Sequence, residues 1–105
     1  MSIDAKLDKI IARFNSLNDK MLDPSSMSSE DYVKVTKEHS DLKDVVEIAI
    51  DYKNTKKNLE EAYSIVKDSS SDPALKEMAE LEIGEMKTKL EKLDNSLKIA
   101  LLPKD

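Results

Sequence analysis

The stretch "DPALKEMAELEIGEMKTKLEKLDNSLKIA", Asp72–Ala100, decides the fold because its apolar residues recur at alternating steps of four and three. This spacing places them on one stripe of an α-helix, as in a packing seam with a period of 3.5 residues. Asp72 can cap the helix, and Pro73 suits its first position, where no amide donor is needed. We therefore predict a helix over 73–101. Its stripe consists of Ala79, Ile83, Met86, Leu90, Leu93, Leu97 and Ala100.

A longer stripe precedes it and predicts a helix over 29–67. Ser28 or Ser29 can cap this helix, and Glu30 and Asp31 follow near the positive end of its dipole. The stripe moves to a neighbouring face midway, which predicts different packing partners along the helix. The alternative to one continuous helix is a break near Asn54. The first face holds Tyr32, Val35, His39, Leu42, Val46 and Ala49, and the second holds Val45, Ile48, Tyr52, Thr55, Leu59, Ala62 and Val66.

A third stripe predicts a helix over 3–22, with Ser2 as a cap. Its members are Ile3, Leu7, Ile10, Phe14, Leu17 and Met21. Prolines at 24, 73 and 103 stand where elements should begin or end. Each helix buries only one stripe, so we predict a single all-α domain over residues 1–105. The expected architecture is an elongated three-helix bundle, in which a long antiparallel, coiled-coil-like hairpin has the N-terminal helix packed alongside.

The composition excludes several classes of function. The chain of 105 residues carries a formal charge of −5, so it is poorly suited to neutralising the phosphates of a nucleic acid. It has 4% aromatic residues, too few for a base-stacking surface, and no cysteine for disulfides or thiolate chemistry. The longest nearly apolar run, Val45–Ile50, is far too short to cross a bilayer. The start, MSIDAKLDK, lacks the apolar run of a signal peptide. We expect a cytoplasmic protein.

No group of residues predicts catalysis. His39 is the single histidine, and Thr36 occupies the position that a Glu-x-x-His metal motif would need to be Glu. One glycine, Gly84, excludes a glycine-rich phosphate loop. We therefore predict no catalytic residue, no cofactor-binding residue and no metal ligand, and we do not expect this chain to be an enzyme. His39 is expected to be a half-buried residue at the edge of the seam.

The remaining candidates favour structural roles. Pairs such as Glu60–Glu61 and Glu80/Glu82 are predicted to be solvated faces. Gly84 inside a helix costs about 1 kcal/mol relative to alanine, which either a close helix crossing repays or the helix simply tolerates. Four methionines are expected in or near the core, namely Met21, Met27, Met78 and Met86.

Three stretches in this order resemble one family: "KEHSDL" at 37–42, "DPALKEMAELEI" at 72–83 and "LLPKD" at 101–105. They are similar to the N-terminal helical domain of the bacterial peptide chain release factor 1 family, over the whole chain and without a disrupting insertion. The resemblance implies that LLPKD marks the exit from this domain. A larger core would follow, with a tripeptide that recognises UAA or UAG and a Gly-Gly-Gln loop that promotes peptidyl-tRNA hydrolysis. The chain has one glycine and no glutamine, so that loop lies outside it.

What the resemblance implies for this domain is docking in translation termination. The expected partners are the stalk base of the large ribosomal subunit and the class II release-factor GTPase, with no direct codon contact and no membrane. The acidic balance fits contact with basic ribosomal proteins. The isolated domain is open to self-association through apolar surface. The alternative is a free-standing coiled-coil adaptor unrelated to termination.

Overall fold

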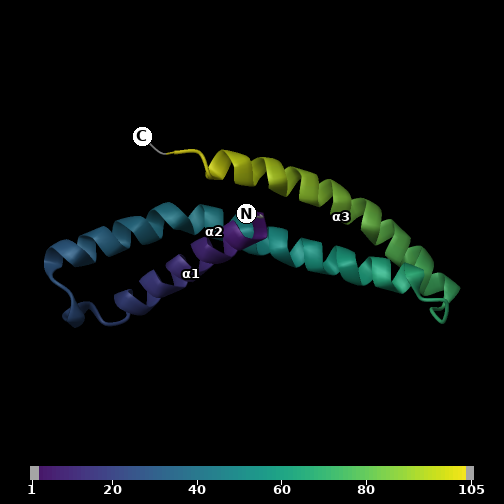
Figure 1. Cartoon of the computed structure of the whole chain (residues 1–105), viewed down its shortest axis with the longest axis horizontal. Helices are drawn as coiled ribbons and strands as arrows, with labels where there is room; N and C mark the ends of the chain where they lie inside the picture. Colours follow the sequence, from purple (N-terminus) through teal and green to yellow (C-terminus); the bar gives the residue numbers. More distant parts are fainter. Residues whose placement is uncertain (1–2, 104–105) are drawn as a thin grey trace. The chain divides into compact units, whose positions relative to one another are not determined.

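The computed structural model describes residues 3–103, which form three α-helices and one short 3-10 helix (Figure 1). Helix α1 spans Ile3–Met21, η1 spans Pro24–Ser26, α2 spans Ser29–Lys67 and α3 spans Pro73–Ala100. The helices begin at the predicted residues and end within one residue of the predicted ends. Ser2, the expected cap of α1, lies outside the described residues, as do Lys104 and Asp105. The all-α class is confirmed.

Helix α2 is continuous through Asn54, so the alternative of a break is wrong. Its start is fixed at Ser28, whose hydroxyl accepts a hydrogen bond from the amide of Asp31 at 3.2 Å. This is the N-cap arrangement, which satisfies an amide that has no partner within the helix. The chain divides into two compact units within α2, Met1–Ile50 and Asp51–Asp105.

In the first unit, α1 packs beside residues 29–50 of α2 as the predicted N-terminal helix (Figure 1). The short η1 segment, begun by Pro24, lies between the two helices. Three fully buried side chains in this unit, Leu7, Leu17 and Ala49, come from the two predicted stripes. Val45 and Val46, which precede Ala49 by four and three residues, are also buried. Burial of each large apolar side chain contributes about 2 kcal/mol, which holds the unit together.

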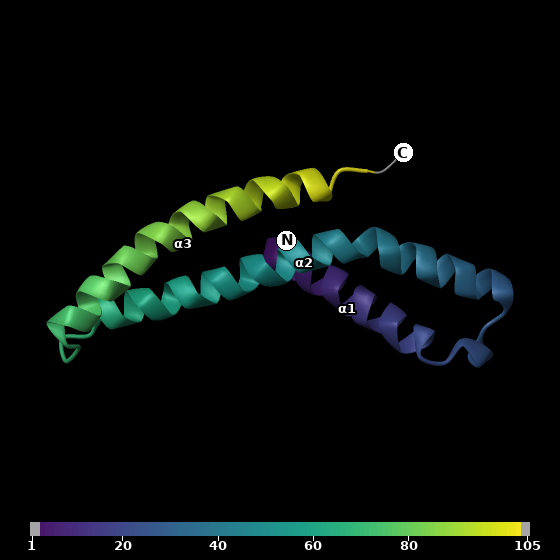
Figure 2. The same ribbon diagram turned by 180° about the vertical axis from the view of Figure 1, so that it is seen from behind.

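In the second unit, α3 runs back along residues 51–67 of α2, which confirms the antiparallel hairpin (Figures 1 and 2). The whole stripe predicted for α3 is at least half-buried, with Ala79 and Leu97 almost inaccessible to solvent. Thr55 is buried on α2 and satisfies its hydroxyl by donating to the carbonyl of Asp51 at 2.8 Å. An ion pair joins Lys89 Nζ to Asp51 Oδ1 at 3.1 Å, which ties α3 to α2.

The turn of the hairpin is closed by two aspartates. Asp68 Oδ1 accepts hydrogen bonds from the amide and hydroxyl of Ser70 at 2.9 and 2.6 Å, and these bonds lower the pKa of the Asp68 carboxyl. Asp72 Oδ1 accepts from the amide of Ala74 at 3.0 Å, and Pro73 occupies the first turn, as predicted. The chain can therefore reverse between two long helices without unsatisfied amides in these positions.

Three expectations about single residues need correction or a decision. Met78 is 59% exposed, so its prediction as a residue in or near the core is wrong; it lies one residue before the buried stripe position Ala79 and faces outward. Tyr32, the first residue of its stripe, is 37% exposed and so lies at the margin of the buried face. A Cβ atom added at Gly84 would meet nothing within 4 Å among the described residues, so no close helix crossing explains this glycine.

Among residues 3–103, no helix combines the length and the hydropathy that a membrane span requires.

Candidate functional site

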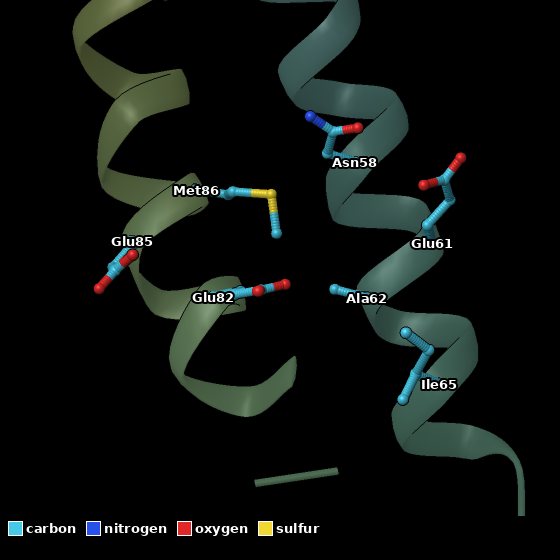
Figure 3. Close-up of a pocket in the computed structure, with 7 residues that line it drawn as sticks. All are labelled: Asn58, Glu61, Ala62, Ile65, Glu82, Glu85 and Met86. Carbon is cyan, nitrogen blue, oxygen red and sulfur yellow. The ribbon is translucent and has the colours of Figure 1, made fainter. Parts of the chain in front are cut away.

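A groove of about 380 Å³ lies between α2 and α3 near the hairpin turn (Figure 3). Its lining combines apolar, amide and acidic side chains: Asn58, Glu61, Ala62, Ile65, Glu82, Glu85 and Met86. Met86 and Glu82 reach from α3 toward Ala62 on α2, whereas Glu61 and Glu85 point outward (Figure 3). The groove therefore combines three apolar side chains, Ala62, Ile65 and Met86, with an acidic rim that consists of Glu61, Glu82 and Glu85.

The helical repeat explains why these residues meet. Ile65 lies three residues after Ala62 and four after Glu61, so it borders both of them on the surface of α2, whereas Glu61 and Ala62 point in different directions. Glu82 and Met86 are separated by four residues, and so share one face of α3. When the two helices pair antiparallel, these faces border the same furrow.

The negative charge of the rim is not neutralised within the described part of the chain. No ion pair involves Glu61, Glu82 or Glu85 among residues 3–103. Two nearby basic residues of α3 are engaged elsewhere: Lys89 pairs with Asp51, and Lys87 Nζ lies 5.6 Å from the ring centroid of Tyr63. An exposed carboxylate is well solvated in water, so the rim costs the fold little. It does, however, set the sign of the charge that this surface attracts.

The apolar character extends along α3 toward the turn. Met78 precedes Glu82 by four residues on the same face of the helix and is 59% exposed. Leu75 lies three residues before Met78 and is 45% exposed. Single exposed apolar residues are common on protein surfaces. Here, two of them continue the row that passes through Glu82 and Met86, so the row forms a longer amphipathic surface.

A second polar cluster joins α1 to the first half of α2. The guanidinium of Arg13 donates two hydrogen bonds to the carboxylate of Glu38, Nε to Oε2 and Nη2 to Oε1, each at 2.7 Å. This two-bond geometry is the strongest form of an arginine–carboxylate pair. The hydrogen bonds hold the pKa of Glu38 below its usual range and raise the pKa of Arg13. Both side chains are partly exposed, so their role is to fix the orientation of α1 on α2.

His39 lies beside this ion pair and has a structural role. Its ring stacks on Phe14, and its Nε2 lies 2.5 Å from Asn18 Oδ1, which accepts the ring N–H. The ring is half-buried, which confirms the position predicted at the edge of the seam. Among the described residues, no group of three or more His, Cys, Asp or Glu side chains could hold a metal ion. The expected absence of catalytic and cofactor-binding residues stays a prediction.

Neither cluster was predicted from the sequence. Glu61 and Glu82 were predicted to belong to solvated faces and Met86 to the buried stripe, and each prediction is accurate for the residue taken alone. The signal that could have revealed the groove is the mixed spacing of acidic and apolar residues on the flanks of two stripes. The Arg13–Glu38 pair needed the register of α1 on α2, which no local pattern provides.

Comparison with known proteins gives this chain a family. Residues 10–105 match the PCRF domain family. The chain is 43% identical over 102 residues to "Peptide chain release factor 1" of Maridesulfovibrio salexigens, covering 96% of this chain and 28% of that protein. It is 39% identical over 104 residues to the protein of the same name from Rickettsia bellii, covering 99% of this chain and 29% of the relative.

The chain thus spans somewhat more than a quarter of the length of these curated relatives. No solved structure gives a significant match. The family match covers α2 and α3 completely and α1 from Ile10 onward, so it includes both the groove and the Arg13–Glu38 pair. The chain belongs to the PCRF domain family.

Proposed function

We propose that these 105 residues are a non-catalytic docking domain of a factor that acts in translation termination at the stop codons UAA and UAG. The observation that carries the proposal is the match to release factor 1 proteins over nearly the whole chain, in two bacteria, at 43% and 39% identity. The fold supports it, because paired helices with a charged surface suit the positioning of one macromolecule on another.

The proposed partners are the stalk base of the large ribosomal subunit and the class II release-factor GTPase. A net charge of −5 favours basic ribosomal proteins over ribosomal RNA, because phosphates would be repelled. The stop codon would be recognised elsewhere in the factor. Peptide release would likewise depend on a Gly-Gly-Gln loop, which these residues cannot form without glutamine. The place of action would be the cytoplasm, where translation occurs.

The test uses purified bacterial ribosomes that hold peptidyl-tRNA and present UAA in the A site. We expect the 105-residue chain alone to release no peptide. In excess, it should slow release by the full-length Maridesulfovibrio salexigens factor, because the two would compete for one docking site. Serum albumin at equal concentration is the control for crowding.

Two results would contradict the proposal. Peptide release by the chain alone would place chemistry within these residues. An unchanged release rate at the highest soluble excess of the chain would remove the docking role and favour the coiled-coil adaptor. Analytical ultracentrifugation of the chain should accompany the assay, because self-association would reduce the free concentration of competitor.

A further inference from the structure

The groove between α2 and α3 has the features of a binding surface for a helix. The groove offers Ala62, Ile65 and Met86 as apolar contacts. Its acidic rim has Glu61 on α2 and Glu82 and Glu85 on α3, of which Glu82 reaches toward Ala62 and the other two point outward. An amphipathic helix buries its apolar face in such a furrow and places its polar flanks against the rim. We propose that the groove binds a basic amphipathic α-helix of a partner protein.

The charges of the groove select this partner over others. Glu61, Glu82 and Glu85 have no ion pair within residues 3–103, so lysine or arginine on the flanks of an incoming helix would find free carboxylates. Nucleic acid and anionic lipid surfaces would be repelled by the same carboxylates. A second copy of the chain would bring its own net charge of −5 to an acidic surface, which opposes self-docking.

The length of the surface sets the length of the partner helix. The row from Leu75 through Met78 and Glu82 to Met86 covers three turns of α3, about 17 Å at a rise of 1.5 Å per residue. Exposed Leu75 and Met78 would then contact the end of the partner helix beyond the groove itself. A matching partner segment has about twelve residues, with apolar side chains at steps of three and four and lysine or arginine on both flanks.

The inference rests on the proposed docking role, because it assigns that role to one surface and names the chemistry of the partner. The helix-binding inference can be tested without the ribosome, so the inference and the proposed function can fail separately. The probe is a synthetic, hydrocarbon-stapled helix of about twelve residues, with leucines along one face and lysines on both flanks. Its matched control carries glutamate in place of every lysine.

The protein variants separate the groove from the general charge of the chain. Glu82→Lys with Glu85→Lys reverses the rim, whereas Glu80→Lys with Glu91→Lys changes the net charge equally on another side of α3. All four glutamates are exposed. Far-ultraviolet circular dichroism shows whether each variant keeps its helices.

We expect the lysine probe to bind the unchanged chain in fluorescence anisotropy, and the glutamate control to bind at least about tenfold more weakly. The Glu82/Glu85 variant should lose at least about tenfold in affinity, and the Glu80/Glu91 variant less than about threefold. Amide shifts in nuclear magnetic resonance spectra should centre on 58–65 and 75–86.

An absence of binding by the lysine probe would overturn the inference, as would equal losses in the two variants. Shifts centred outside the groove would do the same. Failure of the ribosome competition assay alongside successful probe binding would instead contradict the proposed function and leave the groove assignment standing.

Discussion

The ring of His39 on α2 lies stacked on the ring of Phe14 on α1, with centroids 4.4 Å apart and an angle of 18° between the planes. The contact joins the two helices of the first unit at the same level as the Arg13–Glu38 ion pair, one residue earlier on each helix. An apolar contact and a two-bond ion pair therefore fix one register of α1 on α2.

The stacked pair should show energetic coupling in a double-mutant cycle. We expect Phe14→Leu and His39→Gln each to destabilise the chain, and the pair to interact by about 1 kcal/mol. Urea denaturation followed by circular dichroism measures the four free energies of unfolding. Strictly additive effects would show that the rings are neighbours without mutual stabilisation.

The Arg13–Glu38 pair should make stability depend on pH. Because Arg13 lowers the pKa of Glu38 in the folded chain, the contribution is present above the ordinary carboxyl pKa of 4.5 and is lost as the pH falls through the lowered value. Glu38→Gln should therefore lower the melting temperature at pH 7 and have a smaller effect at pH 3.

Glu47→Gln is the matched control for that measurement, since Glu47 is an exposed residue of α2 without an ion pair in the described range. Its effect on the melting temperature should be small at both pH values. An effect of Glu38→Gln that is equal at pH 7 and pH 3 would argue against the assigned cause of the pKa shift.

Gly84 is a position where the chain should gain stability. A methyl group there meets nothing within 4 Å, and the backbone has no positive φ angle at this glycine. Alanine should therefore raise the free energy of unfolding by about 0.5–1 kcal/mol through helix propensity. Chemical denaturation of Gly84→Ala measures it. A loss of stability would reveal a close contact that the structure lacks.

The stripe of α3 should carry most of that helix's contribution to stability. Leu97 is fully buried and Ile99, two residues later, is 71% exposed. Leu97→Ala should cost about 2–5 kcal/mol, and Ile99→Ala less than about 0.5 kcal/mol. Similar costs for the two substitutions, measured by urea denaturation, would mean that the stripe is not the buried face of α3.

Local patterns were sufficient for the helices of this chain. Alternating steps of three and four residues predicted all three, because each helix must bury one stripe, and the caps at Ser28 and Asp72 fixed two of the starts. The drift of the stripe in α2 was also informative, since residues 29–50 pack with α1 and residues 51–67 with α3.

The groove between α2 and α3 could not be predicted from local patterns in the same way. The acidic rim depends on which flank of α2 faces which flank of α3, and that is decided by packing across the hairpin. Met78 shows the same limit, because its neighbour Ala79 carries the stripe while Met78 itself is left exposed. Apolar character alone does not distinguish a core residue from one that contacts a partner.

The claim that this domain docks rather than catalyses can be tested most directly in a chimera. The matched region of the Maridesulfovibrio salexigens factor is replaced by this chain, with and without Glu82→Lys and Glu85→Lys, and peptide release at UAA is measured against factor concentration. We predict that the double variant raises the half-saturating concentration and leaves the maximal rate unchanged. A fall in the maximal rate at an unchanged half-saturating concentration, in a variant that keeps its helices, would contradict the account.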